Sequence, residues 1–92
     1  MYFITTIDSK DDDTRCVGYF KHFEEAERAV LRNSFDICET CYDYVTIENI
    51  EEGIYQYDFQ PKWYKWNNDK EQYEPIEESP KKYKKWVGFA IG

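Results

Sequence analysis

The sequence contains little glycine, proline, cysteine or histidine: its 92 residues include four Gly, three Pro, three Cys and one His. The glycines are scattered at positions 18, 53, 88 and 92, so no glycine-rich phosphate loop is present. The G-x-S-x-G and H-E-x-x-H motifs of hydrolases and metalloproteases are also absent. We therefore expect a protein that is not an enzyme and holds no cofactor.

Long apolar runs are lacking too. Asp8 and the charged run 10–13 interrupt the start of the chain, and the longest uncharged tail, 86–92, is far too short to span a bilayer. We expect no export signal, no membrane partner and a cytoplasmic location. A chain of this length is expected to form one domain, residues 1–92, without a linker.

The three cysteines make an odd number, which favours reduced thiols in the cytosol over a disulfide framework. Cys38 and Cys41 have the C-x-x-C spacing that lets two thiolates share one Zn²⁺, and Cys16 and His22 would complete a Cys₃His set. Structural zinc sites usually contain two pairs of closely spaced ligands. Cys16 and His22 do not have the spacing of such a second pair. Small buried thiols are the simpler interpretation, with a metal-stabilised domain as an alternative.

Aromatic residues, by contrast, are abundant: nine Tyr, six Phe and three Trp, seven of them between Tyr55 and Tyr73. A small domain buries only about two-thirds of the surface of its unfolded chain, and each ring carries roughly 150–250 Å². We expect some of these rings to remain on the surface. Exposed Tyr and Trp are typical of contact with a partner.

Acidic residues outnumber basic ones, 19 to 12, giving a net charge of −7. The excess belongs to residues 1–60, which sum to −9, whereas residues 61–92 sum to +2. Such a charge repels nucleic acids and anionic membranes and favours a basic surface on another protein.

Periodicity predicts the elements of the first half. Residues 2–7 are β-branched and aromatic, as in a central strand, and three consecutive Asp in 9–14 indicate a hairpin loop before a second strand at 15–20. Gly18 is expected to mark a bulge. Apolar residues spaced three and four apart from Phe23 predict a helix that ends at 33–34.

Further strands are expected at 42–50, at 54–59 and in a hairpin formed by 62–66 and 71–76. A short helical turn at 81–86 and a closing strand at 87–91 complete the pattern. The sequence thus predicts an α+β fold: one mostly antiparallel sheet of five to six strands, in the order ββαβββ, a short basic turn and a last β. One main helix covers one face.

The segment 81–86 combines four lysines with Tyr83 and Trp86, a composition that binds single-stranded nucleic acid. In a chain of net charge −7 the lysines are expected to pair with the protein's own acids instead. Direct nucleic-acid binding is therefore kept only as an alternative.

The leading hypothesis is a non-catalytic protein that blocks a basic site on a protein partner. The expected acidic residues are Asp11, Asp12, Asp13, Glu24 and Glu25, and the expected contact rings are Tyr57, Trp63, Tyr64 and Trp66. The acids would steer the encounter, since carboxylates can stand in for phosphates and rings for bases. A homo-oligomer whose aromatic face is only a subunit interface is a further alternative.

A resemblance bears on this hypothesis. The pattern is Met1-Tyr2-Phe3, Val17-Gly18-Tyr19-Phe20, Glu24-Glu25-Ala26-Glu27, Asp36-Ile37-Cys38-Glu39, Tyr42-Asp43-Tyr44, Ile47-Glu48, Glu52-Gly53-Ile54-Tyr55 and Trp63-Tyr64-Lys65-Trp66. It is similar to a group of small acidic proteins of unknown function from Gram-positive bacteria and their phages. Small acidic proteins from phages and mobile elements often inhibit host defence, among them anti-CRISPR proteins that occupy nucleic-acid sites. By analogy, an inhibitor of this kind, acting in the cytosol of a bacterial host, is expected; the resemblance assigns no catalytic or ligand residue.

Overall fold

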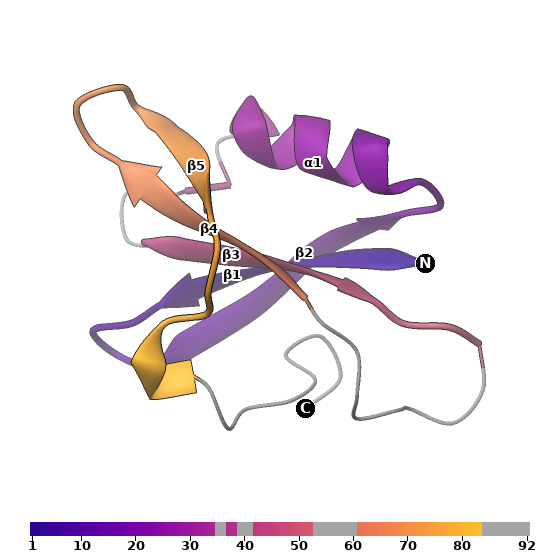
Figure 1. Ribbon diagram of the computed structural model, residues 1–92, viewed down its shortest axis with the longest axis horizontal. Helices are drawn as coiled ribbons and strands as arrows, with labels where there is room; N and C mark the ends of the chain where they lie inside the picture. Colours follow the sequence, from indigo (N-terminus) through magenta and orange to yellow (C-terminus); the bar gives the residue numbers. More distant parts are fainter. Residues whose placement is uncertain (35–36, 39–41, 53–60, 84–92) are drawn as a thin grey trace.

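The structure is a computed structural model that describes residues 1–34, 37–38, 42–52 and 61–83. Its elements in chain order are β1 (Tyr2–Asp8), β2 (Asp13–Phe20), α1 (Phe23–Leu31), β3 (Tyr44–Asn49), β4 (Lys62–Asn67), β5 (Gln72–Ile76) and the 3-10 turn η2 (Lys81–Tyr83). The strands form one antiparallel sheet in the order β2-β1-β3-β4-β5, and α1 lies across one face of it (Figure 1).

This architecture confirms the predicted α+β class, with one antiparallel five-stranded sheet and one helix. The strands predicted at 54–59 and 87–91 lie outside the described residues. The short helical turn predicted at 81–86 is a 3-10 turn over Lys81–Tyr83, and the remainder of that prediction again lies outside the described part of the chain.

The β1–β2 hairpin is longer than the sequence predicted, because β2 begins at Asp13 and leaves a loop of four residues, 9–12. The loop closes at Asp12, whose φ of 56° lies in the left-handed region that Asp tolerates. The register between β1 and β2 shifts at Ile4/Thr5, opposite Cys16 to Gly18. This irregularity confirms the bulge expected near Gly18.

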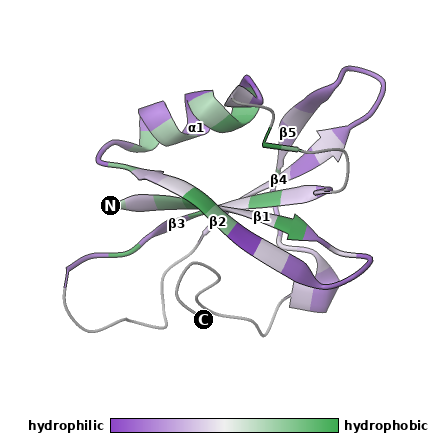
Figure 2. Cartoon of the chain, turned by 180° about the vertical axis from the view of Figure 1, so that it is seen from behind, coloured by the Kyte–Doolittle hydropathy of each residue, from purple (hydrophilic) through white to green (hydrophobic). Residues whose placement is uncertain are grey.

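Helix α1 buries Ala26 and Val30 against the sheet, as its spacing predicts, and apolar and polar segments alternate along it (Figure 2). The helix ends where Asn33 adopts the left-handed conformation, φ 47°, that is favoured just beyond a helix C-terminus. The side-chain oxygen of Asn33 then accepts a hydrogen bond from the Cys38 backbone N–H at 3.0 Å, which holds the chain as it leaves the helix.

Apolar side chains are buried on both faces of the sheet. Below α1 the core consists of Ile4, Ala26, Val30, Cys38, Val45, Ile47, Tyr64 and Tyr73. A smaller cluster of Ile7, Trp63 and Tyr83 lies separately, with Tyr44 and Ile76 packed against it. The strand register places Ile7, Tyr44, Trp63 and Ile76 on the face away from the helix. Both faces of the central strands are therefore covered.

One hydrogen bond ties α1 to β4 through the first core. The Tyr64 hydroxyl donates to the carboxylate of Glu27, on the second turn of the helix. Burial, followed by the hydrogen bond and the charge of Glu27, raises the pKa of Tyr64 well above its ordinary value. The phenol therefore stays protonated and keeps donating over the whole neutral pH range.

Candidate partner-binding surface

The acidic residues predicted to act together occupy two separate places. Asp11, Asp12 and Asp13 are exposed at the β1–β2 loop, where Asp8 pairs with Asp13. Glu24 and Glu25 are exposed in the first turn of α1, just beyond the other end of β2, where Phe20 pairs with Tyr2. Between these two pairings β1 extends over six residue steps, from Asp8 to Tyr2, which is about 20 Å. The acids therefore do not form one continuous field.

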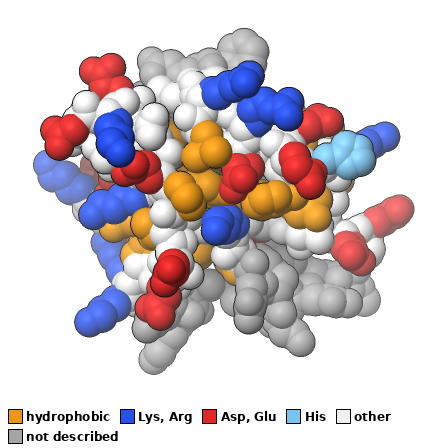
Figure 3. All heavy atoms as spheres, turned by 45° about the horizontal axis from the view of Figure 1, so that its top comes forward, with side chains coloured by type: hydrophobic (Ala, Val, Ile, Leu, Met, Phe, Trp, Pro, Cys, Tyr) orange, Lys and Arg blue, Asp and Glu red, His pale blue; other side chains and the backbone are white. Residues whose placement is uncertain are grey.

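The acids of α1 are also balanced by nearby bases. Arg28 lies in the last turn of the helix and Arg32 at its C-cap, both exposed. On the side of the molecule that α1 covers, acidic and basic side chains alternate around a strip of apolar ones (Figure 3). This mixed face offers no uniform negative potential to a basic partner.

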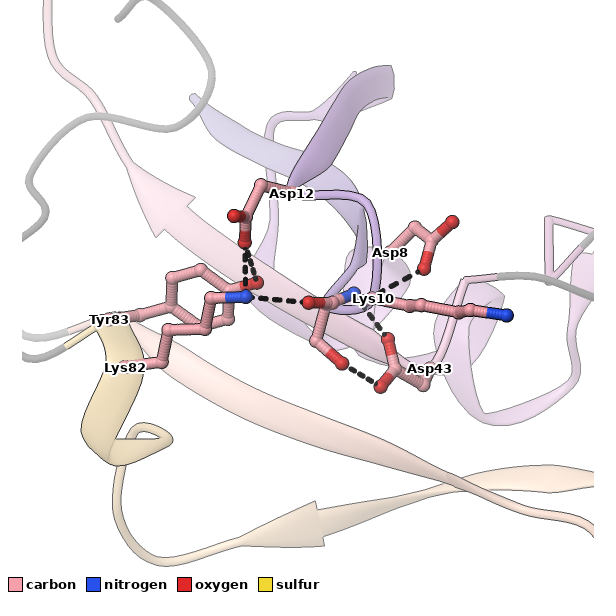
Figure 4. Close-up of polar contacts among 7 residues, drawn as sticks. Asp8, Lys10, Asp12, Asp43, Lys82 and Tyr83 are labelled. Atoms are coloured by element: carbon pink, nitrogen blue, oxygen red, sulfur yellow. Dashed lines mark hydrogen bonds and ion pairs between the residues drawn. The ribbon is translucent and has the colours of Figure 1, made fainter.

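The loop acids, in contrast, lie in an organised group that we call the acidic hairpin, residues 8–13 together with Asp43. Both carboxylate oxygens of Asp43 accept hydrogen bonds from Ser9, one from its N–H at 2.9 Å and one from its hydroxyl. Asp8 accepts a hydrogen bond from the Lys10 N–H at 3.1 Å (Figure 4). These contacts fix the first half of the loop against the start of β3.

The acidic hairpin holds a lysine of the same chain. The Lys82 ammonium lies 2.5 Å from a carboxylate oxygen of Asp12 and donates to the Ser9 carbonyl at 2.6 Å (Figure 4). Both charged side chains remain about half exposed, 47% for Lys82 and 49% for Asp12. The sequence could not show this pair, because its members are 70 residues apart; only the expectation that 81–86 pairs with the protein's own acids anticipated it.

Tyr83, the residue after Lys82, is buried beside the same loop. Its ring stacks on Trp63 with centroids 5.9 Å apart and planes 9° from parallel, and its hydroxyl lies 3.5 Å from an Asp12 carboxylate oxygen. Burial and the nearby carboxylates of Asp12, Asp43 and Asp8 raise the pKa of Tyr83 to about 12. The hydroxyl therefore remains a hydrogen-bond donor at neutral pH.

Two of the predicted contact rings are buried in the structure of the free chain. Trp63 is 4% exposed and Tyr64 is fully buried, which corrects the expectation that they form an aromatic surface. Neighbouring residues of a strand point to opposite faces, and here both faces are covered, one by α1 and the other by η2. Two adjacent aromatic residues in a central strand indicate this double burial.

Trp66 is half-buried: its ring meets Tyr73 edge-on at 5.0 Å, and its indole N–H donates to the Asn68 side chain at 2.8 Å. Tyr57 lies outside the described residues. Among the large apolar side chains that are described, the exposed ones are Met1, Tyr19 and Leu31. Tyr19 lies in β2, Leu31 at the end of α1 and Met1 just before β1.

A groove of about 470 Å³ runs between α1 and the edge strand β2. Its floor is apolar, with Ile4, Val17 and Phe20 among the residues that line it, and Glu25, Arg28 and Arg32 stand at its rim. The rim charges carry both signs. The groove is therefore a hollow of mixed chemistry rather than part of the acidic hairpin.

The alternative metal set is dispersed in the described part of the chain. Cys16 is exposed on β2, His22 occupies the position before α1, and Cys38 is buried in the core below the helix. Cys38 acts as a small buried thiol, with its sulfur 3.7 Å from the Tyr42 carbonyl oxygen. Cys41 lies outside the described residues, and among those described no group of three His, Cys, Asp or Glu is placed to hold a metal ion.

The basic segment 81–86 offers less to nucleic acid than its composition indicates. Lys81 is exposed, but Lys82 is engaged by Asp12, and the Tyr83 ring is 1% exposed and already stacked. A buried ring cannot serve as a platform for a base. Residues 84–86 lie outside the described part.

No helix among the described residues has the length and apolar character needed to cross a bilayer. Comparison of the chain with protein families, with curated proteins and with solved structures finds no match.

Proposed function

We propose that this chain is a non-catalytic binding protein whose acidic hairpin blocks a basic site on a protein partner. The nucleic-acid-binding site of a CRISPR or other host-defence effector is the first partner to test, because carboxylates on the hairpin can stand in for nucleic-acid phosphates. Within this proposal the hairpin is the contact, and α1 supports the sheet that presents it.

The observation that carries the proposal is the lysine already bound at the hairpin. Asp12 and the Ser9 carbonyl hold the Lys82 ammonium at hydrogen-bonding distance, so the loop has the geometry to bind a cationic side chain. Asp11 and Asp13 flank this point and are exposed. A partner's lysine or arginine side chains would meet two further carboxylates there, at high solvent exposure, where charges mainly speed association and set specificity.

The experiment measures displacement of nucleic acid. Purified RNA-guided effectors are loaded with fluorescently labelled target DNA, and DNA release on addition of this protein is followed by anisotropy. We expect stoichiometric release that weakens as salt rises from about 0.05 M to about 0.5 M, since screening reduces attraction between exposed charges. Release that does not depend on salt, or no release from any effector tested, would overturn the proposal.

Two matched double variants locate the contact. Asp11→Asn with Asp13→Asn, and Glu24→Gln with Glu25→Gln, each remove two exposed carboxylates, at opposite ends of β2. We expect the hairpin variant to weaken binding by about tenfold and the helix variant by less than about twofold. Equal losses would mean that net charge alone is recognised, and the hairpin would lose its assigned role.

A further inference from the structure

Lys82 and Tyr83 together fill one continuous site. The ammonium of Lys82 contacts Asp12 and the Ser9 carbonyl, and the ring of the next residue stacks on Trp63. The site is arranged by contacts that do not involve η2. Asp43 holds Ser9 through its N–H and hydroxyl, and the register of β3 and β4 places Trp63 beside Thr46.

The element that fills the site is small, and of its two contacting side chains Lys82 is half exposed whereas Tyr83 is buried. η2 spans three residues, with a backbone hydrogen bond from the Tyr83 N–H to the Pro80 carbonyl at 2.9 Å. The ion pair of Lys82 with Asp12 is about half exposed on both sides, and exposed ion pairs contribute little free energy because water solvates the separated charges well. The lysine contact can therefore be exchanged at little cost, whereas release of the buried Tyr83 ring must be offset by a partner ring that takes its place on Trp63.

We propose that the Asp12 carboxylate, the Ser9 carbonyl and the Trp63 ring form a binding surface for a lysine followed by an aromatic residue on a partner. Lys82 and Tyr83 occupy this surface in the free protein and are displaced when the partner binds. The inference rests on the proposed function and specifies its ligand: a primary ammonium for the carboxylate and carbonyl oxygens, then a flat ring for the face of the indole that Tyr83 covers in the free protein.

This arrangement makes η2 an internal competitor. The affinity of a partner is reduced by the fraction of molecules in which the site is already filled. Loss of the Lys82 ammonium should therefore strengthen binding of an external lysine, although it raises the net negative charge by only one. Lys81 is the matched control, because it is exposed on the same turn and has the same charge.

The probe is the blocked pentapeptide Ser-Pro-Lys-Lys-Tyr, which copies residues 79–83. Its binding to the full chain is followed by NMR, through the indole N–H signal of Trp63 assigned with a Trp63→Phe variant. We expect Lys82→Gln to bind the peptide about three- to fivefold more tightly than the unmodified chain. Lys81→Gln should change the affinity by less than about twofold.

Further outcomes separate this inference from the proposed function. Lys82→Gln combined with Asp12→Asn should lose the gain, because the carboxylate is then absent. Equal affinities for Lys82→Gln and Lys81→Gln, or peptide binding that leaves the Trp63 signal unchanged, would overturn the inference. If effectors are still displaced through Asp11 and Asp13 while Lys82→Gln has no effect, the proposed function stands and this surface does not.

Discussion

Single tyrosines connect the parts of this molecule through their hydroxyl groups. Tyr64 donates from β4 to Glu27 of α1, Tyr73 donates at 2.7 Å to the Tyr42 carbonyl, and Tyr83 lies against Asp12. Each ring supplies buried apolar area and each hydroxyl finds an acceptor, which removes the cost of burying a polar group. The high tyrosine content therefore serves the interior as well as the surface.

These tyrosines predict a loss of stability at alkaline pH. The pKa of Tyr83 is raised to about 12 in the folded chain, while the unfolded chain ionises near pH 10. The stabilisation is complete below pH 10 and is lost as pH rises from about 10 to about 12, by up to about 1.4 kcal/mol per pH unit. Urea unfolding at several pH values measures this fall.

Tyr83→Phe keeps the ring on Trp63 and removes the ionising group. The variant should show a shallower fall of the unfolding free energy above pH 10 than the unmodified chain. Tyr64, whose pKa is also raised, remains in the variant, so part of the fall should persist. Identical slopes for the two proteins would contradict the role given to Tyr83.

Among the elements, α1 begins without a side-chain cap. His22 occupies the N-cap position with extended backbone angles and makes no capping hydrogen bond. The first turn of a helix has backbone N–H groups without intrahelical partners, and Glu24 and Glu25 compensate only through their charge. The helix therefore depends on Ala26 and Val30 packing against the sheet.

His22→Ser should stabilise the protein by about 1 kcal/mol, because the serine hydroxyl can accept from a first-turn N–H. Glu25 lies three residues later and would complete a capping box with the new serine. The free energy of unfolding in urea is the measurement, and His22→Ala serves as the control that provides no acceptor. A gain of the same size in His22→Ala would refute the capping explanation.

For the molecule as a whole, the two edges of the sheet differ. β5 has Pro75, which lacks an N–H and resists pairing with another strand. β2 is longer and unprotected by proline, but it has a bulge and the exposed charge of Asp13 at its start. Among the described residues the exposed large apolar side chains are Met1, Tyr19 and Leu31, which favours a single chain in solution.

We therefore expect light scattering to give the mass of a monomer at about 0.1 mM. Asp13→Thr removes a charge from the β2 edge and should increase self-association, since uncharged edge strands pair with one another. Pro75→Ala makes the same comparison on β5. A dimer of the unmodified chain would instead favour the alternative that the protein is a homo-oligomer.

Much of the fold was predictable from the local pattern of side chains. The β-branched and aromatic run of β1, the alternation in β3, the three- and four-residue spacing in α1 and the turn residues between β4 and β5 each describe a short stretch of chain, and their predicted elements are confirmed. Local backbone preferences and one-sided burial act over a few residues, so the sequence alone carries them. The acidic character of the hairpin loop is of the same kind.

Which rings are buried and which charges are paired was decided by packing between distant segments. Trp63 and Tyr64 are buried because α1 and η2 cover opposite faces of one strand, and Lys82 reaches Asp12 across 70 residues of sequence. The composition gives the number of rings and charges, but it does not determine which segments pack against them. Glu24 and Asp13 belong to the same acidic stretch of sequence, yet the length of β2 carries them to opposite ends of the sheet, because an extended strand separates its ends by the full rise of its residues.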